Sequence, residues 1–240
     1  MHNTVVNSEI TDALAAFAVK PLTDMGVLLW AGLAVSQARE VAILEEDISG
    51  RIPGLLQSQG NDMRVRAWEL GALLAHQTQT TISMPVLAAV IALGESLKVP
   101  EDEIAAAAAI GIEAAVRILA AVDSAEYRQR WNVASSVGVL GAALAASRLL
   151  KLDEARTRHA LGLAATQTAG LARNEGHSMA SIEVGKAAAD AIEASILAKH
   201  GFTSAPAAID GRRGFAALMA YRFEAGAITE GLGERWVMQG

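Results

Sequence analysis

The sequence contains no cysteine and few aromatic residues. Without cysteine the chain can form neither disulfides nor thiolate metal sites, and a cysteine nucleophile is excluded. Aromatic residues make up 4% of the chain, although hydrophobic residues together make up 52%. Much of that hydrophobic content is alanine, which favours tightly packed helices over a β-sandwich. We therefore expect an all-α protein, and the lack of cysteine is consistent with a cytoplasmic location.

Basic residues are also scarce, with 20 lysines and arginines against 26 acidic residues and a net charge of −6. No basic patch gathers to neutralise phosphates, so a nucleic-acid partner is not expected. The N-terminus lacks the basic and apolar regions of a signal peptide. Of the two most apolar runs, residues 84–97 are too short to span a bilayer and residues 104–122 carry Glu113 and Arg117. We expect a soluble cytoplasmic protein without a membrane partner.

Common catalytic and cofactor motifs are missing. The chain has no phosphate-binding loop, no HExxH and no GxSxG. The pair Gly138 and Gly141 lies inside a helical stretch without a preceding strand, which indicates helix packing rather than a dinucleotide turn. The five histidines are scattered along the chain, so neither a metal site nor a cofactor is predicted.

Helical periodicity and end signals divide the chain into helices within one all-helical domain, 1–240. The expected helices cover residues 10–19, 21–38, 63–76, 85–97, 104–121, three segments within 131–202, and 215–222. Pro21 and Pro85 are placed in first turns, Asp153 is a predicted N-cap, and Gly201 follows a basic last turn.

The polar segments between these helices are predicted to be loops. They are residues 39–62 (with at most one short helix), 127–132, 173–178 and 204–213, followed by a glycine-punctuated tail that ends near Trp236. Segments 127–132 and 173–178 gather polar groups beside an otherwise apolar bundle. An active site is expected at these two loops.

Two histidines are candidates for acid–base chemistry. His76 ends a helix, where it could act as a base or simply interact with the helix dipole. His177 precedes a helix that begins near Ser178, and a helix N-terminus favours a bound anion and a neutral imidazole. His177 could therefore be a base beside a bound carboxylate, or a solvated loop residue.

Two charged pairs at helical spacing also stand out. Glu183 and Lys186 lie three residues apart and could pair on one helix face. Glu113 and Arg117 lie four apart in a very apolar helix, where a buried structural ion pair is the favoured interpretation.

Several short stretches resemble the helical domain of the MmgE/PrpD family of 2-methylcitrate dehydratases, decarboxylases and epimerases. They share their order and spacing with that family and comprise residues 24–27, 31–32, 84–87, 92–95, 111–113 with Arg117, 138–150, 160–164, 185–188, 200–203 and 214–215. The resemblance implies a helical bundle that acts without a cofactor on a small carboxylate. It covers most of the chain.

The family's catalytic positions are changed here. Thr78 and Asn132 stand where the resemblance implies histidines, Ala180 where it implies a lysine, and Glu183 where it implies a further histidine. We therefore expect a divergent lyase or isomerase, of the dehydration, decarboxylation, epimerisation or cyclisation type, acting on a small carboxylate or biosynthetic intermediate. The predicted catalytic residues are His177 and His76, and the predicted substrate-binding residues are Asn132, Lys186, Arg130, Thr78 and Glu183.

The family's second α+β domain follows a Gly-Leu-Gly-x-x-Trp segment, which here runs from Gly231 to Trp236. Because the sequence ends shortly afterwards, we expect that domain to be absent. A separate chain or self-association would then cover the cleft, or the cleft is open and altered. A homodimer is expected because an apolar bundle without its cover would expose a patch. The alternative function is a non-catalytic binding or scaffold subunit that needs a separate chain carrying the second domain.

Overall fold

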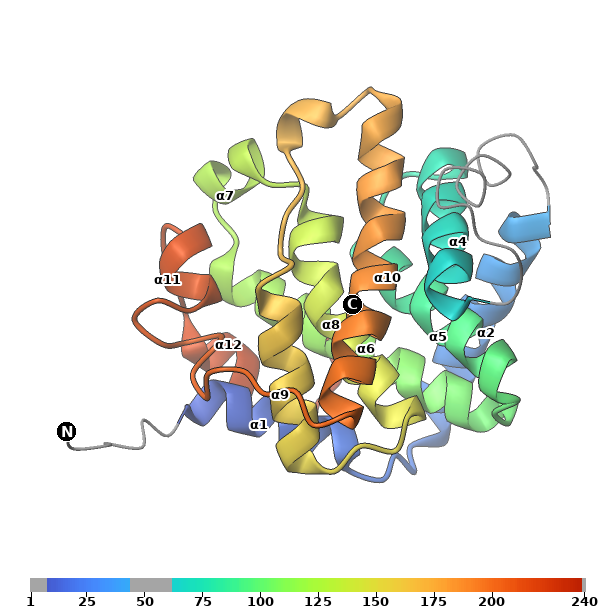
Figure 1. The fold of residues 1–240 in the computed structure, drawn as a ribbon, viewed down its shortest axis with the longest axis horizontal. Coiled ribbons are helices and arrows are strands. Elements are labelled where there is room, and N and C mark those ends of the chain that lie inside the picture. The colour runs from blue at the N-terminus through green and yellow to red at the C-terminus, as the bar shows by residue number, and fades with distance from the viewer. Residues whose placement is uncertain (1–7, 44–61, 239–240) are drawn as a thin grey trace.

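The computed structural model describes residues 8–43 and 62–238, and all regular elements in these ranges are helices (Figure 1). They are α1 (Glu9–Val19), α2 (Met25–Ile43), α4 (Met63–Gln77), α5 (Met84–Leu97), α6 (Glu101–Val122), α7 (Ala125–Arg130), α8 (Val133–Leu149), α9 (Glu154–Ala165), the 3₁₀ turn η1 (Ala172–Asn174), α10 (Ser178–Lys199), α11 (Phe215–Met219) and α12 (Ala225–Thr229). Trp131 and Leu171 form an isolated antiparallel bridge. The predicted all-α class is confirmed.

The core is built from α5, α6 and α8. Residues 84–94, 104–115 and 134–147 are buried without interruption, which accounts for the continuous small and aliphatic sequences of these helices. In Figure 1, α6 and α8 lie behind α9 and α10, near the middle of the bundle. By length and composition α6 could cross a membrane, but 83% of its most apolar window is buried inside the protein. Its hydrophobicity is explained by its place in the core.

Glycines allow pairs of helices to pack backbone against backbone. A Cβ atom on Gly111 of α6 would lie 2.7 Å from the carbonyl oxygen of Gly141 on α8. A Cβ atom on Gly71 of α4 would lie 2.7 Å from the Cα atom of Gly185 on α10. The small residues of α8 were expected to permit such close approach, and they do.

Several predicted helix ends are confirmed in atomic detail. The Asp153 carboxylate accepts a hydrogen bond from the Arg156 N–H at 2.8 Å and caps α9. Gly201 has φ +87° after the end of α10, a conformation that glycine adopts without strain. Such local signals locate helix ends because they depend on few neighbours.

The start of α2 differs from the prediction. Pro21 does not open a helix; α2 begins at Met25, after Asp24 accepts hydrogen bonds from the N–H groups of Gly26 and Val27 at 2.9 and 3.1 Å. An aspartate that satisfies two free N–H groups outweighs the preference of proline for a first turn. At its other end α2 continues through residues 39–43, which were expected to be loop; residues 44–61 of that predicted loop lie outside the described residues.

Three other predicted segments differ in part from the structure. The expected loop 127–132 begins inside α7, whose N-cap Ser124 accepts from the Tyr127 N–H at 3.1 Å. The short helix expected over 215–222 ends at Met219, and the tail contains α12. Tyr127 is fully buried and donates to Ser136 on α8 at 2.9 Å, so a tertiary contact holds α7 in place.

The predicted buried ion pair is present on α6. Arg117 Nε lies 2.6 Å from Glu113 Oε1, and both side chains are almost completely buried. The Arg117 guanidinium also donates to carbonyl oxygens of the segment that follows α11, at Ala227, Ile228, Glu230, Gly231 and Arg235. The Glu113 carboxylate accepts from the N–H groups of Val237 and Met238. The pair therefore joins the C-terminal segment to the core.

Candidate functional site

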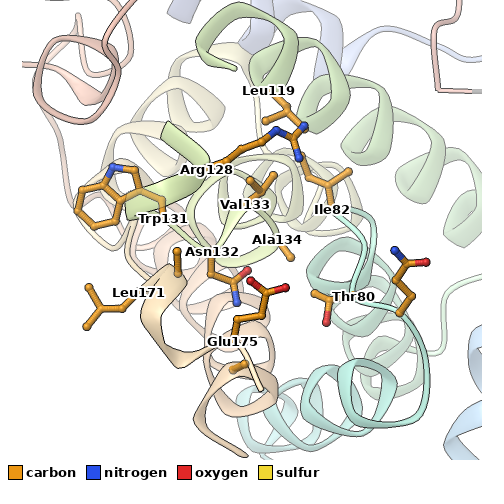
Figure 2. Close-up of a pocket in the computed structure, with 13 residues that line it drawn as sticks. Thr80, Ile82, Leu119, Arg128, Trp131, Asn132, Val133, Ala134, Leu171 and Glu175 are labelled. Carbon is orange, nitrogen blue, oxygen red and sulfur yellow. The ribbon is translucent and has the colours of Figure 1, made fainter. Parts of the chain in front are cut away.

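A cavity of about 440 Å³ lies where the predicted loops meet. Its walls come from the segment before α5, the end of α6, the α7–α8 junction, and the connection from α9 to α10 (Figure 2). The lining residues are Gln79, Thr80, Ile82, Leu119, Arg128, Trp131, Asn132, Val133, Ala134, Leu171, Ala172, Glu175 and Ala180. Segments 127–132 and 173–178, which the sequence marks as the site, both contribute to it.

Three helix N-termini contribute to this cavity. Ile82 immediately precedes the N-cap of α5, Asn132–Ala134 begin α8, and Ala180 lies in the first turn of α10. Within the described part of the chain, no protein acceptor bonds the backbone N–H groups of Val133 and Ala134. Unpaired N–H groups and helix dipoles attract anions, so the cavity favours a negatively charged ligand.

Asn132 caps α8 and faces the cavity. Its Oδ1 atom accepts from the Ser135 N–H at 3.3 Å, which leaves its amide nitrogen as a donor. Its backbone N–H donates to the carbonyl oxygen of Gly170 at 3.0 Å, which holds the α9–α10 connection against the start of α8. Figure 2 labels both Asn132 and Glu175 among the residues that line this cavity. The cavity lining therefore includes both an amide donor and a carboxylate.

Two charged side chains line the cavity. Glu175 is exposed and supplies its one carboxylate among the described residues. Arg128 donates two hydrogen bonds to Asp123, at 2.6 and 2.9 Å, and these bonds raise the pKa of the Arg128 guanidinium. Arg128 is therefore a fixed cation at the cavity edge, whereas the Glu175 carboxylate makes no salt bridge within the described residues.

The remaining wall is apolar and held by backbone contacts. Ile82, Leu119 and Val133 contribute aliphatic surface, and the Trp131 ring is fixed by a hydrogen bond from Nε1 to the Met219 carbonyl at 3.2 Å. Leu171 is 56% exposed at this wall. Apolar walls with a few convergent polar groups are typical of small-molecule sites.

Most residues predicted to form the site lie outside this cavity. Asn132 lines it, but His76, His177, Arg130 and Thr78 do not, and all four are exposed. Thr78 instead donates to the Leu74 carbonyl at 3.0 Å and closes the end of α4. The proposed catalytic roles of His76 and His177 remain predictions.

Glu183 and Lys186 do not form the pair that their spacing allows. Lys186 Nζ lies 2.6 Å from Asp190 Oδ2 one turn further along α10. Glu183 instead accepts from Asn174 Nδ2 at 2.5 Å and from the Leu171 N–H at 3.4 Å. The carboxylate is directed to the connection before α10 because that segment offers two donors. Both Glu183 and Lys186 line a second, smaller cavity.

Sequence reasoning missed Glu175, Arg128, Gln79 and Thr80 as lining residues. Arg128 and Arg130 both lie in the polar stretch, and only the phase of α7, fixed by buried Tyr127, decides that Arg128 faces the cavity. Glu175 is two residues from His177 in the same predicted loop. The sequence therefore identifies the polar segments that line the cavity, but not which side chains in them face it.

The comparisons with known proteins agree with this architecture. The model of the MmgE/PrpD N-terminal domain matches residues 72–226, which is more than half of the chain and includes every lining residue. This chain belongs to the MmgE/PrpD family. Asn132 and Ala180, which stand at family histidine and lysine positions by resemblance, both line the cavity of this MmgE/PrpD member.

A human relative, cis-aconitate decarboxylase, is 33% identical over 139 residues. The match covers 57% of this MmgE/PrpD chain and 29% of the relative, so the chain spans less than a third of that protein's length. The described residues contain no group of three His, Asp or Glu side chains arranged to hold a metal ion.

Proposed function

We propose that this protein is a divergent lyase or isomerase that acts, without a cofactor, on a small carboxylate held in the larger cavity. The observation that carries the proposal is the contribution of three helix N-termini to one cavity that also contains the Glu175 carboxylate. The helix ends favour an anionic ligand, and a carboxylate is the small anion that the family chemistry suggests.

The residues of the cavity can be assigned complementary roles. The N–H groups of Val133 and Ala134, with the Asn132 amide, would hold the substrate carboxylate. Glu175 would take a proton from the neighbouring carbon, becoming a carboxylic acid and leaving an enolate-type anion next to the bound carboxylate. Delivery of a proton from solvent water to the opposite face, while Glu175 releases its own proton to solvent, gives epimerisation. Loss of a hydroxyl group from the next carbon, protonated to water by Glu175, gives dehydration.

The replacement of the family's histidines and lysine limits the number of carboxylates that the substrate can carry. Thr78, Asn132 and Ala180 carry no charge, so fewer cations are available to bind several carboxylates. Arg128 is already paired with Asp123. We therefore propose a substrate with one or two carboxylates, or a less charged biosynthetic intermediate.

The direct test is proton exchange in deuterated water. The purified chain is incubated with a panel of small mono-, di- and tricarboxylates and followed by proton NMR. We expect deuterium to enter next to a carboxylate in a mono- or dicarboxylate, with or without product formation. If the panel shows binding by NMR line broadening but neither exchange nor conversion, the catalytic proposal fails.

A second candidate is a non-catalytic binding or scaffold subunit completed by a separate chain. It is favoured by the lining itself, which among the described residues includes no histidine or lysine, and by Leu171, 56% exposed beside the cavity. A carboxylate would then bind without exchange until a chain related to the second domain of the family is added. A gain of exchange only on mixing the two chains identifies this case.

We also propose that the protein is a homodimer formed through α2. Met25, Leu29 and Leu33 recur every fourth residue on this helix and are 65%, 65% and 64% exposed. Residues at this spacing form one continuous stripe. An apolar stripe on a helix surface is typical of a protein–protein contact.

A further inference from the structure

The larger cavity has more room than a small carboxylate requires. Its volume of about 440 Å³ lies within the ~300–1,000 Å³ of pockets that enclose drug-sized ligands. A carboxylate held at the start of α8, together with the neighbouring carbon, occupies only a small part of that space. The residues that line the rest of the cavity therefore indicate what else the ligand carries.

One wall of this cavity is the edge of the hydrophobic core. Ile82 lies just before α5, Leu119 lies in the last turn of α6, and Val133 is the first residue of α8. All three pack against the main core but are only partly buried, and all three line the cavity (Figure 2). Trp131 is also partly buried against the core and lines the cavity. The described side chains thus leave an apolar surface partly uncovered in the cavity.

The anion-binding backbone adjoins this apolar wall. Val133 contributes an unpaired N–H group at the start of α8, and the same residue belongs to the wall. The carbons attached to a carboxylate bound at that N–H would therefore lie within reach of apolar side chains. Each methylene group buried there should tighten binding by about fourfold.

A second carboxylate would find no free cation in this cavity. Arg128 is the one cationic residue that lines it in the described part of the chain. The Arg128 guanidinium already donates two hydrogen bonds to Asp123, at 2.6 and 2.9 Å. A carboxylate placed against the apolar wall would lose its hydration without gaining a partner, which is costly. An uncharged hydrocarbon group suits this wall better.

We propose that the ligand of the larger cavity is a monocarboxylate with a short hydrocarbon chain that packs against Ile82, Leu119 and Val133. This inference rests on the proposed function for the anionic half of the ligand, and it adds the chemical class of the other half. Ile82 and Leu119 are then specificity-determining residues, because they contact the hydrocarbon chain and not the reacting carbon.

The test compares the binding of acetate, butyrate and hexanoate to the purified chain by amide NMR titration at constant ionic strength. We expect saturable shifts at Val133 and Ala134, and a Kd for hexanoate at least about tenfold lower than that for acetate. Adipate has the carbon chain of hexanoate but carries a second carboxylate at its far end, so it should bind more weakly than hexanoate. The titration measures binding and does not depend on turnover.

Two variants locate the hydrocarbon chain. Leu119→Ala removes apolar surface from the cavity and should lower the ratio of hexanoate affinity to acetate affinity by about threefold or more. Ile82→Ala should lower the same ratio, and it decides the question if Leu119→Ala does not fold. Leu119→Met keeps the apolar surface and should preserve the ratio. Leu218→Ala is the matched control, because Leu218 is exposed and does not line the cavity.

Failure of this inference can be distinguished from failure of the proposed function. Equal affinity for acetate and hexanoate, adipate binding as tightly as hexanoate, or an unchanged ratio in both Leu119→Ala and Ile82→Ala would overturn the apolar half of the ligand and leave the anionic site in place. The alcohol 1-hexanol carries the same chain without a charge. If it binds as tightly as hexanoate, the anionic site fails, and the proposed function fails with it.

Discussion

Arg117 and Glu113 stand one helical turn apart on α6, and their 2.6 Å contact is shielded from solvent by the segment it binds. Charge alone would not place such a pair in the core, because removing two ions from water is costly. Here the remaining donors and acceptors are satisfied by backbone groups between Ala227 and Met238. The pair is thus the point at which α6 positions the C-terminal segment.

Replacing Arg117 with methionine should destabilise the protein by about 3–5 kcal/mol, because Glu113 would be left buried without a cation. Urea unfolding followed by circular dichroism measures the change. Arg156→Met is the matched control, because Arg156 pairs with Asp153 at 3.6 Å on the surface and should contribute about 0–1 kcal/mol. Equal losses of unfolding free energy in the two variants would show that the buried pair stabilises the protein no more than a surface pair does.

Two glycines with different surroundings, Gly185 at the α4–α10 contact and Gly32 on α2, should respond oppositely to replacement by alanine. A Cβ atom on Gly185 would lie 2.7 Å from the Ala72 backbone nitrogen, so Gly185→Ala should cost about 1–3 kcal/mol through overpacking. Gly32 of α2 has its nearest neighbour at 3.9 Å, and Gly32→Ala should gain up to about 1 kcal/mol from helix propensity. Thermal unfolding of both variants tests the difference, and a stabilised Gly185→Ala protein would contradict the close packing.

Substitutions at Glu175 and at His177 distinguish between these two candidate bases. Glu175 lines the cavity and His177 does not, so Glu175→Gln should lower the rate of deuterium exchange by about 10²-fold or more, whereas His177→Ala should leave it within a few-fold. The measurement is the exchange rate with the carboxylate that the panel identifies, with folding checked by circular dichroism. The reverse pattern would support the base assigned from the sequence and refute the role of Glu175.

The sequence alone predicts features that depend on residues nearby in the chain. Caps such as Asp153, the end of α10 at Gly201 and the pairing of Glu113 with Arg117 follow from residues within one or two turns. The cavity was not predictable in the same way. Whether Arg128 or Arg130 faces it depends on the contact of Tyr127 with Ser136. Glu183 turns from Lys186 to Asn174 because a loop brings the donors close. These side-chain orientations depend on tertiary contacts, so no local pattern in the sequence predicts them.

The homodimer proposal leads to a surface substitution on α2. Leu29 lies in the middle of the exposed Met25–Leu29–Leu33 stripe, so Leu29→Glu should place a charge in the dimer contact and yield a folded monomer. Light scattering after size exclusion gives the mass. Leu218→Glu is the control, because Leu218 is 71% exposed on α11, on the side of the bundle away from α2 (Figure 1). A wild-type monomer, or a Leu29→Glu dimer, contradicts the proposed interface.

Glu69 on α4 predicts a pH-dependent change in stability. Burial raises the pKa of the Glu69 carboxyl, and nearby Arg66 only partly opposes the shift. A raised folded-state pKa means that the contribution of Glu69 to stability is fully present below its unfolded pKa of about 4.3 and is lost as pH rises through the folded pKa. Glu69→Gln should therefore be more stable than wild type at neutral pH, by up to about 0.5 kcal/mol, and equally stable in acid. Urea unfolding of both proteins at several pH values measures the difference, and a variant that is less stable at neutral pH would show that the attraction to Arg66 exceeds the cost of burial.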